Sequence, residues 1–445
     1  MERDLAAALI DAARKAGADN ADALVVSSRD VSVSVREGAL EEAESAEGVD
    51  YGLRVLVGRK QASVSASDPS PDVLSELAER VVAMAKAAPD DPYAGLADAD
   101  RLADPASLPE LDMVDPSEPP SPAALQEAAL AAEAAALAVD GVAQAESAGA
   151  GWRRSTVAFA TSHGFLGAYD RSSASISVSA VAGEGLGMET DYAFSSRVYA
   201  ADLETPEEIG ALAGRRAVES LNPRKAKTGA WPVIFDQRAA GSLIGHVMGA
   251  INGGAVARGA SWLKDRLGEE VLPAALSLTD DPHRVRALGS RPFDGEGMAI
   301  APRPLIENGV LLDWVMDTAA ARQLGRPAPG GARRGVGSPP SPGTSNLTFT
   351  EGDKSRDALI AEMDEGLIVT SLIGSSISAT TGAYSRGASG FWVENGEIAY
   401  PVNELTIAGS LPDFIKTMVP ANDADHAKSL IVPSILVEGL TVASG

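Results

Sequence analysis

The first half of the chain repeatedly alternates apolar and polar side chains, and this period of two restricts those segments to half-buried β-strands. Three such runs come early, at 21–28, 31–38 and 51–67. Turn residues such as Glu37-Gly38 separate them, and helical periodicity flanks them at 3–17 and 72–88. Helix, antiparallel strands and helix in this order predict an α+β unit.

A second unit with the same order of parts follows a segment rich in proline and aspartate at 89–122, which we interpret as an exposed linker. It opens with an alanine-rich helix at 123–139 and closes with a helix at 206–221. Its expected strands lie at about 141–147, 154–161, 164–170 and 174–184. We therefore expect an N-terminal α+β domain over 1–222, made of subunits at about 1–90 and 121–222.

Residues 223–445 are rich in glycine and in turn pairs such as Asn308-Gly309 and Asn395-Gly396. The expected helices are few, at 237–251, 259–266, 317–324, 355–365 and 411–418. Proline and glycine dominate 325–345, so this stretch is predicted to be a long loop near a functional face. We expect this half to be a glycine-rich, mainly antiparallel β domain with a few helices.

Acidic residues outnumber basic ones by 62 to 37, which gives the chain a net charge of −25. Such a surface repels phosphate backbones, so direct binding of nucleic acid is not expected. The absence of cysteine excludes disulfides and sulfur-ligated zinc, and it fits a reducing cytoplasm. The amphipathic start does not resemble a signal peptide, and no apolar run could span a membrane. We expect a cytoplasmic protein without membrane contact.

The stretch SLIGHVMGAINGG, residues 242–254, places one histidine in a short helix. At 100° per residue, the large apolar side chains fall in one arc and His246 falls on the opposite, small-residue face. The large apolar side chains are Leu243, Ile244, Val247, Met248 and Ile251. Three interpretations of His246 stay open: packing at a helix face, contact with substrate in a cavity, and metal ligation.

The spacing of the histidines does not favour a metal site. A catalytic metal needs three converging ligands and an open position for water. None of the four histidines stands four or five residues from another, so no helix can present a pair. A mixed site of histidine and carboxylates stays open, but nothing in the spacing indicates one, and we assign no metal ligand to this chain.

The segment TTGAYSRGASGFWVENGEI, residues 380–398, concentrates polar and aromatic groups between glycines. It lacks the G-x-S-x-G elbow of a serine nucleophile, so no catalytic residue is assigned. A glycine-rich hairpin within the β half accounts for the pattern, and a peptide groove is the alternative. The candidates for peptide contact are His246, Tyr384, Ser385, Arg386 and Ser389.

Several long phrases resemble the TldD/PmbA family, and within it the PmbA or TldE branch. The most specific are FDQRAAGSLIGHVMGAINGGAVARGASWL, RPFDGEGMAIAPRPLIENGVLLDWVMDT and TTGAYSRGASGFWVENGEIAYPVNELTIAGSL, all in the C-terminal half. The resemblance implies a metalloprotease built from two subunits. Its TldD-type subunit carries H-E-x-x-x-H on the helix that matches 237–251, and a cysteine on a later strand.

Carried onto this chain, the two histidine positions are Gly245 and Ala250, and the glutamate position is His246. The cysteine position is Val369. The resemblance thus implies that this chain holds no metal and is inactive alone, while zinc is expected in the TldD-type partner. Without the ion there is no activated water to attack a peptide bond.

The leading hypothesis is a non-catalytic TldE/PmbA-type subunit of a cytoplasmic protease, paired with a TldD-like chain in a heterodimer. The resemblance implies extended or unfolded peptides as substrates, including precursors of peptide antibiotics. A homodimer of the isolated chain stays open. Two other hypotheses remain: a self-sufficient peptidase with a non-standard site near His246, and a regulator of DNA gyrase acting through protein contacts, as the family's older label "modulator of DNA gyrase" suggests.

Overall fold

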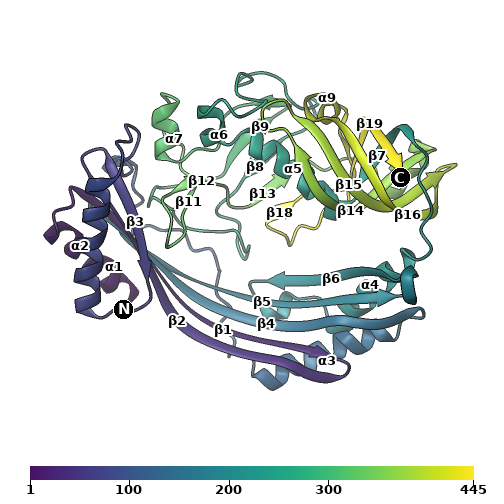
Figure 1. The fold of residues 1–445 in the computed structure, drawn as a ribbon, viewed down its shortest axis with the longest axis horizontal. Helices are drawn as coiled ribbons and strands as arrows, with labels where there is room; N and C mark the ends of the chain where they lie inside the picture. The colour runs from purple at the N-terminus through teal and green to yellow at the C-terminus, as the bar shows by residue number, and fades with distance from the viewer. Residues whose placement is uncertain (445) are drawn as a thin grey trace.

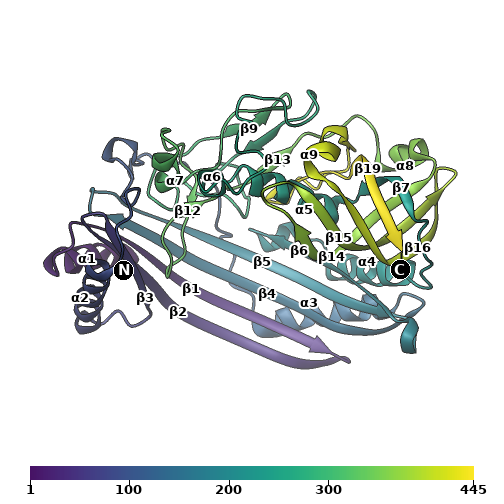
Figure 2. The same cartoon turned by 45° about the horizontal axis from the view of Figure 1, so that its top comes forward.

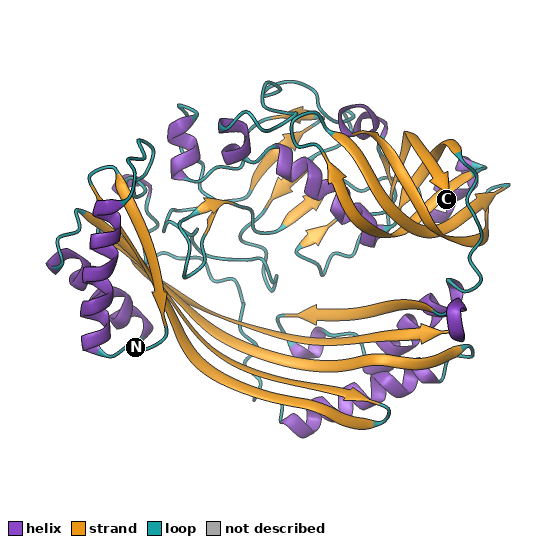
Figure 3. Cartoon of the chain, in the orientation of Figure 1, coloured by secondary structure: helices purple, strands orange, loops and turns teal. Residues whose placement is uncertain are grey.

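The computed structural model describes residues 1–444, and its mixture of helices and strands confirms the predicted α+β class (Figures 1 and 3). The helices of the N-terminal half are α1 (Glu2–Lys15), α2 (Pro71–Ala87), α3 (Pro122–Leu137) and α4 (Pro206–Glu219). Those of the C-terminal half are α5 (Gln237–Ala250), α6 (Gly253–Ala257), α7 (Thr318–Gln323), α8 (Arg356–Met363) and α9 (Leu411–Phe414). In the described chain, no helix combines the length and apolar character needed to cross a bilayer.

One six-stranded antiparallel sheet organises the N-terminal half, in the order β3-β2-β1-β4-β5-β6. Its strands are β1 (Asn20–Arg36), β2 (Ala39–Val57), β3 (Lys60–Ala66), β4 (Val142–Thr161), β5 (Leu166–Ala182) and β6 (Glu189–Arg197). Pairing of β1 with β4, from Asp22–Thr161 to Val35–Ala148, joins the two predicted helix–strand units edge to edge. Figure 2 shows these long strands running side by side beneath the C-terminal half.

Both helix pairs cover the same face of this sheet because side chains alternate along each strand. Ala21, Ala23 and Val25 of β1 are buried with residues of α1 and α2. Further along the same face, Val31, Val33 and Val35 are buried with residues of α3 and α4. The intervening residues, such as Leu24, point to the opposite face and pack with Phe159 and Phe293. The opposite face is therefore the one that meets the C-terminal half.

The strands differ from the prediction in their length. The segments 21–28 and 31–38 form one continuous strand, β1, and the predicted run 51–67 divides into β2 and β3 at a turn around Gly58. The first part of β2 was missed because residues 39–48 are exposed and show no apolar alternation. Backbone pairing with β1 holds that part in place. The edge strand β6 was missed as well.

The C-terminal half is mainly a β structure, as predicted, and its main sheet is strongly curved. Five strands pair in the order β16-β15-β14-β7-β19, and β19 pairs again with β16, which closes the sheet into a barrel. They are β7 (Gly229–Phe235), β14 (Gly366–Ile377), β15 (Ala383–Glu394), β16 (Glu397–Ser410) and β19 (Ile435–Ser444), and β17 (Val419–Pro420) pairs with β19. All these pairs are antiparallel except β14 with β7.

A second, smaller sheet in this half has the order β10-β9-β8-β13-β18. Its strands are β8 (Leu278–Asp280), β9 (Arg303–Glu307), β10 (Val310–Leu311), β13 (Leu347–Phe349) and β18 (Leu430–Ile431). The predicted long loop at 325–345 is mostly irregular, but it holds the short pair β11 (Ala332–Arg333) and β12 (Ser341–Pro342).

The helix predicted at 259–266 is wrong, because this stretch forms turns. The helical segment lies earlier, in α6, where the side chain of Asn252 accepts a hydrogen bond from the Ala255 N–H at 3.1 Å and so caps the helix. Ser261 then donates its hydroxyl hydrogen to the Ala250 carbonyl and accepts the Leu263 N–H at 2.9 Å. These local bonds compete with helix formation.

The C-terminal half docks on the open face of the N-terminal sheet through its loops. A side chain at Gly52 of β2 would meet the carbonyl oxygen of Val336, and one at Gly167 of β5 would meet the ring of Phe293. Beside these contacts, the buried carboxylate of Asp22 pairs with the guanidinium groups of Arg54 and Arg334. The two glycines and this ion cluster fix where the halves meet.

Candidate functional site

Helix α5 supplies the candidate residues, and its sequence explains its orientation. The side chain of Asp236 caps the helix by accepting the N–H groups of Arg238 and Ala239, each at 3.0 Å. Leu243, Ile244, Val247 and Ile251 are each 1% exposed or less, and Met248 is partly buried against the same core. This confirms the predicted apolar arc, since one stripe of large residues fixes which face of a helix is buried.

His246 is half-buried and packs against the segment that was predicted to lie in the same groove. Its ring meets the ring of Tyr384 edge-on, with centroids 5.7 Å apart at 74°. Its Nε2 atom is buried, and no residue that the structure describes gives it a hydrogen-bond partner. Burial, and then the nearby charge of Arg386, lower the pKa of His246 below its ordinary value. The imidazole is therefore neutral at pH 7.

The small-residue face of α5 has space where side chains could project. A Cβ added at Gly245 or at Gly249 would have no atom of the described chain within 4 Å, whereas Ala250 is 4% exposed. Val369 is fully buried in β14, which packs beside α5. These positions carry no oxygen, nitrogen or sulfur atom in their side chains, so they do not fit a metal ion. Across residues 1–444, no three His, Cys, Asp or Glu side chains are arranged to hold one.

Strand β15 brings Tyr384 and Arg386 against α5. Tyr384 is 3% exposed and also packs on Phe414, and burial raises its pKa to about 12. Arg386 donates from Nη1 to the Ser242 hydroxyl at 3.1 Å, across a sequence separation of 144 residues. The structure therefore gathers His246, Tyr384 and Arg386 into one cluster, in which the tyrosine stays protonated and the arginine carries the charge.

A cleft of about 810 Å³ lies beside this cluster, between the N-terminal sheet and the barrel. We call it the interdomain cleft, and it is bounded by the start of β6, the first turns of α5 and parts of β14, β15 and β16. Of the predicted groove residues, Arg386 and Ser389 line it. His246, Tyr384 and Ser385 are not among its lining residues, although the rings of His246 and Tyr384 contact each other and both lie near the charge of Arg386.

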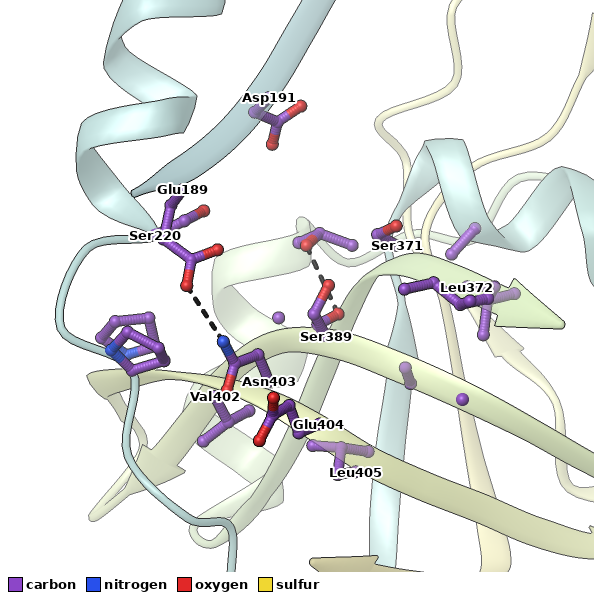
Figure 4. Close-up of a pocket in the computed structure, with 18 of the residues that line it drawn as sticks. Glu189, Asp191, Ser220, Ser371, Leu372, Ser389, Val402, Asn403, Glu404 and Leu405 are labelled. Carbon is purple, nitrogen blue, oxygen red and sulfur yellow. Dashed lines mark hydrogen bonds between the residues drawn. The ribbon is translucent and has the colours of Figure 1, made fainter. Parts of the chain in front are cut away.

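Two polar contacts cross the cleft from β6 to the C-terminal half. Asn403 donates from Nδ2 to Glu189 at 2.9 Å, and Arg238 pairs with Asp191 at 2.6 Å. Burial raises the pKa of Glu189. Figure 4 shows Glu189 and Asp191 on one side, with Ser389, Asn403 and Glu404 on the other. Sequence reasoning missed these residues, because their partners stand far apart along the chain and no local pattern marks them.

Large apolar side chains stand exposed around the cleft. Met188, Tyr192 and Ile373 line it and are each at least half exposed. Tyr192 stacks on Phe194 with ring centroids 6.2 Å apart at 18°, and Phe194 is 56% exposed. Exposed apolar groups clustered beside a cavity are typical of a surface that binds another molecule.

The chain matches three family models, which together span most of its length. Residues 21–85 match domain 1 of the PmbA/TldA metallopeptidases, residues 115–221 match the central domain, and residues 228–444 match the C-terminal domain.

Individual relatives agree with these matches. The chain is 36% identical over 426 residues to the metalloprotease PmbA of Escherichia coli O157:H7, covering 96% of this chain and 92% of that protein. It is similar to a solved structure from Bacteroides thetaiotaomicron named as a modulator of DNA gyrase, with a TM-score of 0.91, 28% identity and coverage of 99% and 98%. The fold also matches TldE of Thermococcus kodakarensis, with a TM-score of 0.85 at 22% identity, over 99% of this chain and 100% of that one.

Proposed function

The chain belongs to the PmbA/TldD family of metallopeptidases, and from this premise we propose that it is a non-catalytic, TldE-type subunit of a cytoplasmic protease. Its partner is a TldD-like chain that carries the catalytic zinc. Together the two chains process or degrade extended and unfolded peptides, and this chain contributes binding surface rather than reacting groups.

The observation that carries this proposal is the chemistry of α5 and β14 at the positions where the partner type holds its ligands. Gly245, Ala250 and Val369 offer no donor atom, and the base position holds His246 instead of a carboxylate. The pKa of His246 is lowered, so a neutral imidazole is available, but a base without an activated water does not cleave peptides efficiently.

The interdomain cleft supports the peptide part of the proposal. Strand β14 pairs with β7 only from Leu367 to Val369, so beyond that point one of its edges has no neighbouring strand within residues 1–444. Residues Thr370 to Ile373 on this stretch line the cleft. An extended peptide can add to such an edge through backbone hydrogen bonds, which bind it without demanding a particular sequence.

Co-expression with a TldD-like chain from the same genome tests the proposal. We expect a stable complex, with stoichiometric zinc and peptidase activity that depend on the partner. The isolated chain is expected to contain no stoichiometric metal and to cleave no unfolded peptide. Metal and cleavage in this chain alone, lost on His246→Ala, would instead assign it a self-sufficient site and overturn the proposal.

The role of the interdomain cleft in binding peptide can be tested in the same complex. Arg386→Gln removes the charge beside the cleft and should raise the KM for peptides while the zinc content stays unchanged. Arg80→Gln on the exposed face of α2 is the matched control, because it removes one guanidinium far from the cleft. An equal effect of both variants would contradict a role of the cleft in binding peptide.

A further inference from the structure

A second cavity, of about 350 Å³, lies where the loops of the C-terminal half meet the open face of the N-terminal sheet. Its floor is formed by β1, β4 and β5, and its other walls come from 288–295 and 333–334. We call it the arginine cavity, because four arginines line it. They are Arg171, Arg291, Arg333 and Arg334.

The charge of this cavity is opposite to that of the protein. The chain carries 62 acidic residues against 37 basic ones, yet Asp294 is the one carboxylate among the residues that line the cavity. Asp294 is itself engaged by backbone N–H groups: Oδ1 accepts from Glu296 and Met298, and Oδ2 accepts from Gly331 and Ala332. Arg334 pairs with Asp22, which lies outside the lining, whereas Arg171, Arg291 and Arg333 form no ion pair with a carboxylate among the described residues.

Arg334 is a buried charged residue that lines the arginine cavity. Its side chain is 1% exposed, and Nη1 pairs with Asp22. Its Nε and Nη2 atoms are buried with no hydrogen-bond partner among the described residues. A buried guanidinium with free donors is costly unless an acceptor occupies the space beside it.

The other arginines leave donors available in the same space. Arg171 uses Nη2 on the Leu288 carbonyl, and Arg333 uses Nε on the Thr344 carbonyl at 2.7 Å. Each nitrogen of Arg291 already makes one hydrogen bond, to Ser345 or to the carbonyls of Ala332 and Gly331, so Arg291 contributes mainly its charge. Guanidinium groups bind carboxylate and phosphate oxygens through paired N–H donors.

Most of the other side chains that line the arginine cavity are apolar. Leu24, Val26 and Val157 share the floor with Phe159, and Phe293 closes the side next to Tyr169. The rings of Phe293 and Tyr169 already pack edge to face at 5.3 Å, so they do not form a slot for a flat base. The chemistry fits an anionic head on a compact apolar body.

We propose that the arginine cavity binds a small organic anion, a carboxylate or phosphate carried by an apolar group. Arg171, Arg333 and Arg334 hold the anionic head, and the floor of the sheet packs on the apolar part. Such a ligand bridges both halves of the chain, because Arg171 belongs to the sheet and the other two belong to a loop of the C-terminal half. The inference stands apart from the proposed protease role, since it concerns the isolated chain.

Calorimetry on the full chain tests the proposal with matched ligands. We expect 3-phenylpropanoate to bind and its neutral amide to bind at least about tenfold more weakly, with affinity for the acid falling as salt rises. Equal binding of acid and amide, or no binding of any anion tried, would overturn the proposal. Two further ligands distinguish the possible classes of anion: phenyl phosphate represents a phosphate ester, and an acetylated peptide that ends in phenylalanine represents a peptide C-terminus. The one that binds more tightly identifies the class of ligand.

Variants locate the site. Arg171→Gln and Arg333→Gln should each weaken binding of the acid about tenfold, whereas Arg80→Gln should leave it unchanged. Arg333 is exposed, so its variant keeps the test valid even if Arg171→Gln destabilises the fold. Unchanged affinity in both cavity variants would place the anion elsewhere and overturn the assignment. Peptidase activity of a complex is not needed for either readout.

Discussion

The environment at the junction between the two halves strongly raises the pKa of Glu296. Glu296 is 4% exposed, and its Oε2 accepts the N–H and the hydroxyl of Thr318 at 2.9 and 2.8 Å. Burial, followed by the negative charge of Asp294, raises the pKa of Glu296 to about 8. The charge of Arg54 opposes this shift without cancelling it.

This pKa makes stability depend on pH in a defined direction. Between the ordinary carboxyl value of 4.5 and about 8, the folded state holds a proton that the unfolded state has released. Raising the pH through this window should therefore reduce the free energy of unfolding by about 1.4 kcal/mol per pH unit from this group. Glu296→Gln keeps an acceptor for Thr318 and should remove that contribution.

Urea denaturation of both proteins at pH 5, 6, 7 and 8 measures the difference. As the pH rises, the free energy of unfolding of the glutamine variant is expected to increase relative to that of the natural protein. If the free energy of unfolding of the two proteins changed with pH in parallel, the pKa of Glu296 in the folded state would be that of an ordinary carboxyl group.

The candidate site shows which residue-level predictions the sequence can support. Helical angles placed Leu243 and Val247 in the core, because the period of one helix decides that question. The contact between Arg386 and Ser242 had no local signal, since it depends on how β15 packs against α5. The same holds for Asp191 and Arg238, which meet only when β6 approaches the C-terminal half.

Among the elements, α5 carries three glycines, Gly241, Gly245 and Gly249, and only the first is packed against another side chain of the described residues. Gly245 and Gly249 lie on its exposed side, and neither has a positive φ. Glycine in a helix interior costs free energy relative to alanine, because the unfolded chain has more conformations to lose. Here the missing side chains are not required by close packing, since both positions face open space.

Gly245→Ala and Gly249→Ala should therefore each stabilise the protein by roughly 0.5–1 kcal/mol. The matched control is Gly210→Ala in α4, where the new Cβ would lie 2.0 Å from the Ala132 carbonyl oxygen. That variant should be destabilised by about 1–3 kcal/mol from overpacking. Thermal unfolding of the three variants tests the prediction; loss of stability in both α5 variants would show that the glycines serve the backbone of the helix.

The ends of a helix or strand could be predicted where one of its faces is buried. They could not be predicted where both of its faces are exposed. The alternation of Val31, Val33 and Val35 in β1 and the stripe of α2 are both direct consequences of burial on one side. The exposed half of β2 has no such pattern, and its strand exists because β1 supplies hydrogen-bond partners over its whole length. The helix expected at 259–266 failed because Ser261 offers the backbone a competing turn.

At the scale of the whole molecule, the two halves are held together by close backbone contact as well as by charge. The loop at Val336 rests directly on Gly52, so any side chain there would push the loop away from the sheet. The N–H groups of Gly331 and Ala332 anchor the same loop to Asp294.

Gly52→Ala should loosen this docking. Its Cβ would fall 1.7 Å from the Val336 carbonyl oxygen, and we expect a loss of about 1–3 kcal/mol in stability. Amide hydrogen exchange should become faster in 331–338. Gly48→Ala in the same strand is the control, because its Cβ meets nothing within 4 Å. Equal exchange in both variants would mean that the loop does not depend on the contact.

The shared sheet also has a consequence for synthesis of the protein on the ribosome. β1 must leave its free edge open until β4 emerges, after the linker, α2 and α3 have been translated. At about 5–20 residues per second, this wait lasts on the order of ten seconds. An open edge invites pairing with neighbouring nascent chains. The adjacent exposed stretch of β2 carries Glu41, Glu42, Glu44 and Glu47, and like charges on two such chains oppose that pairing.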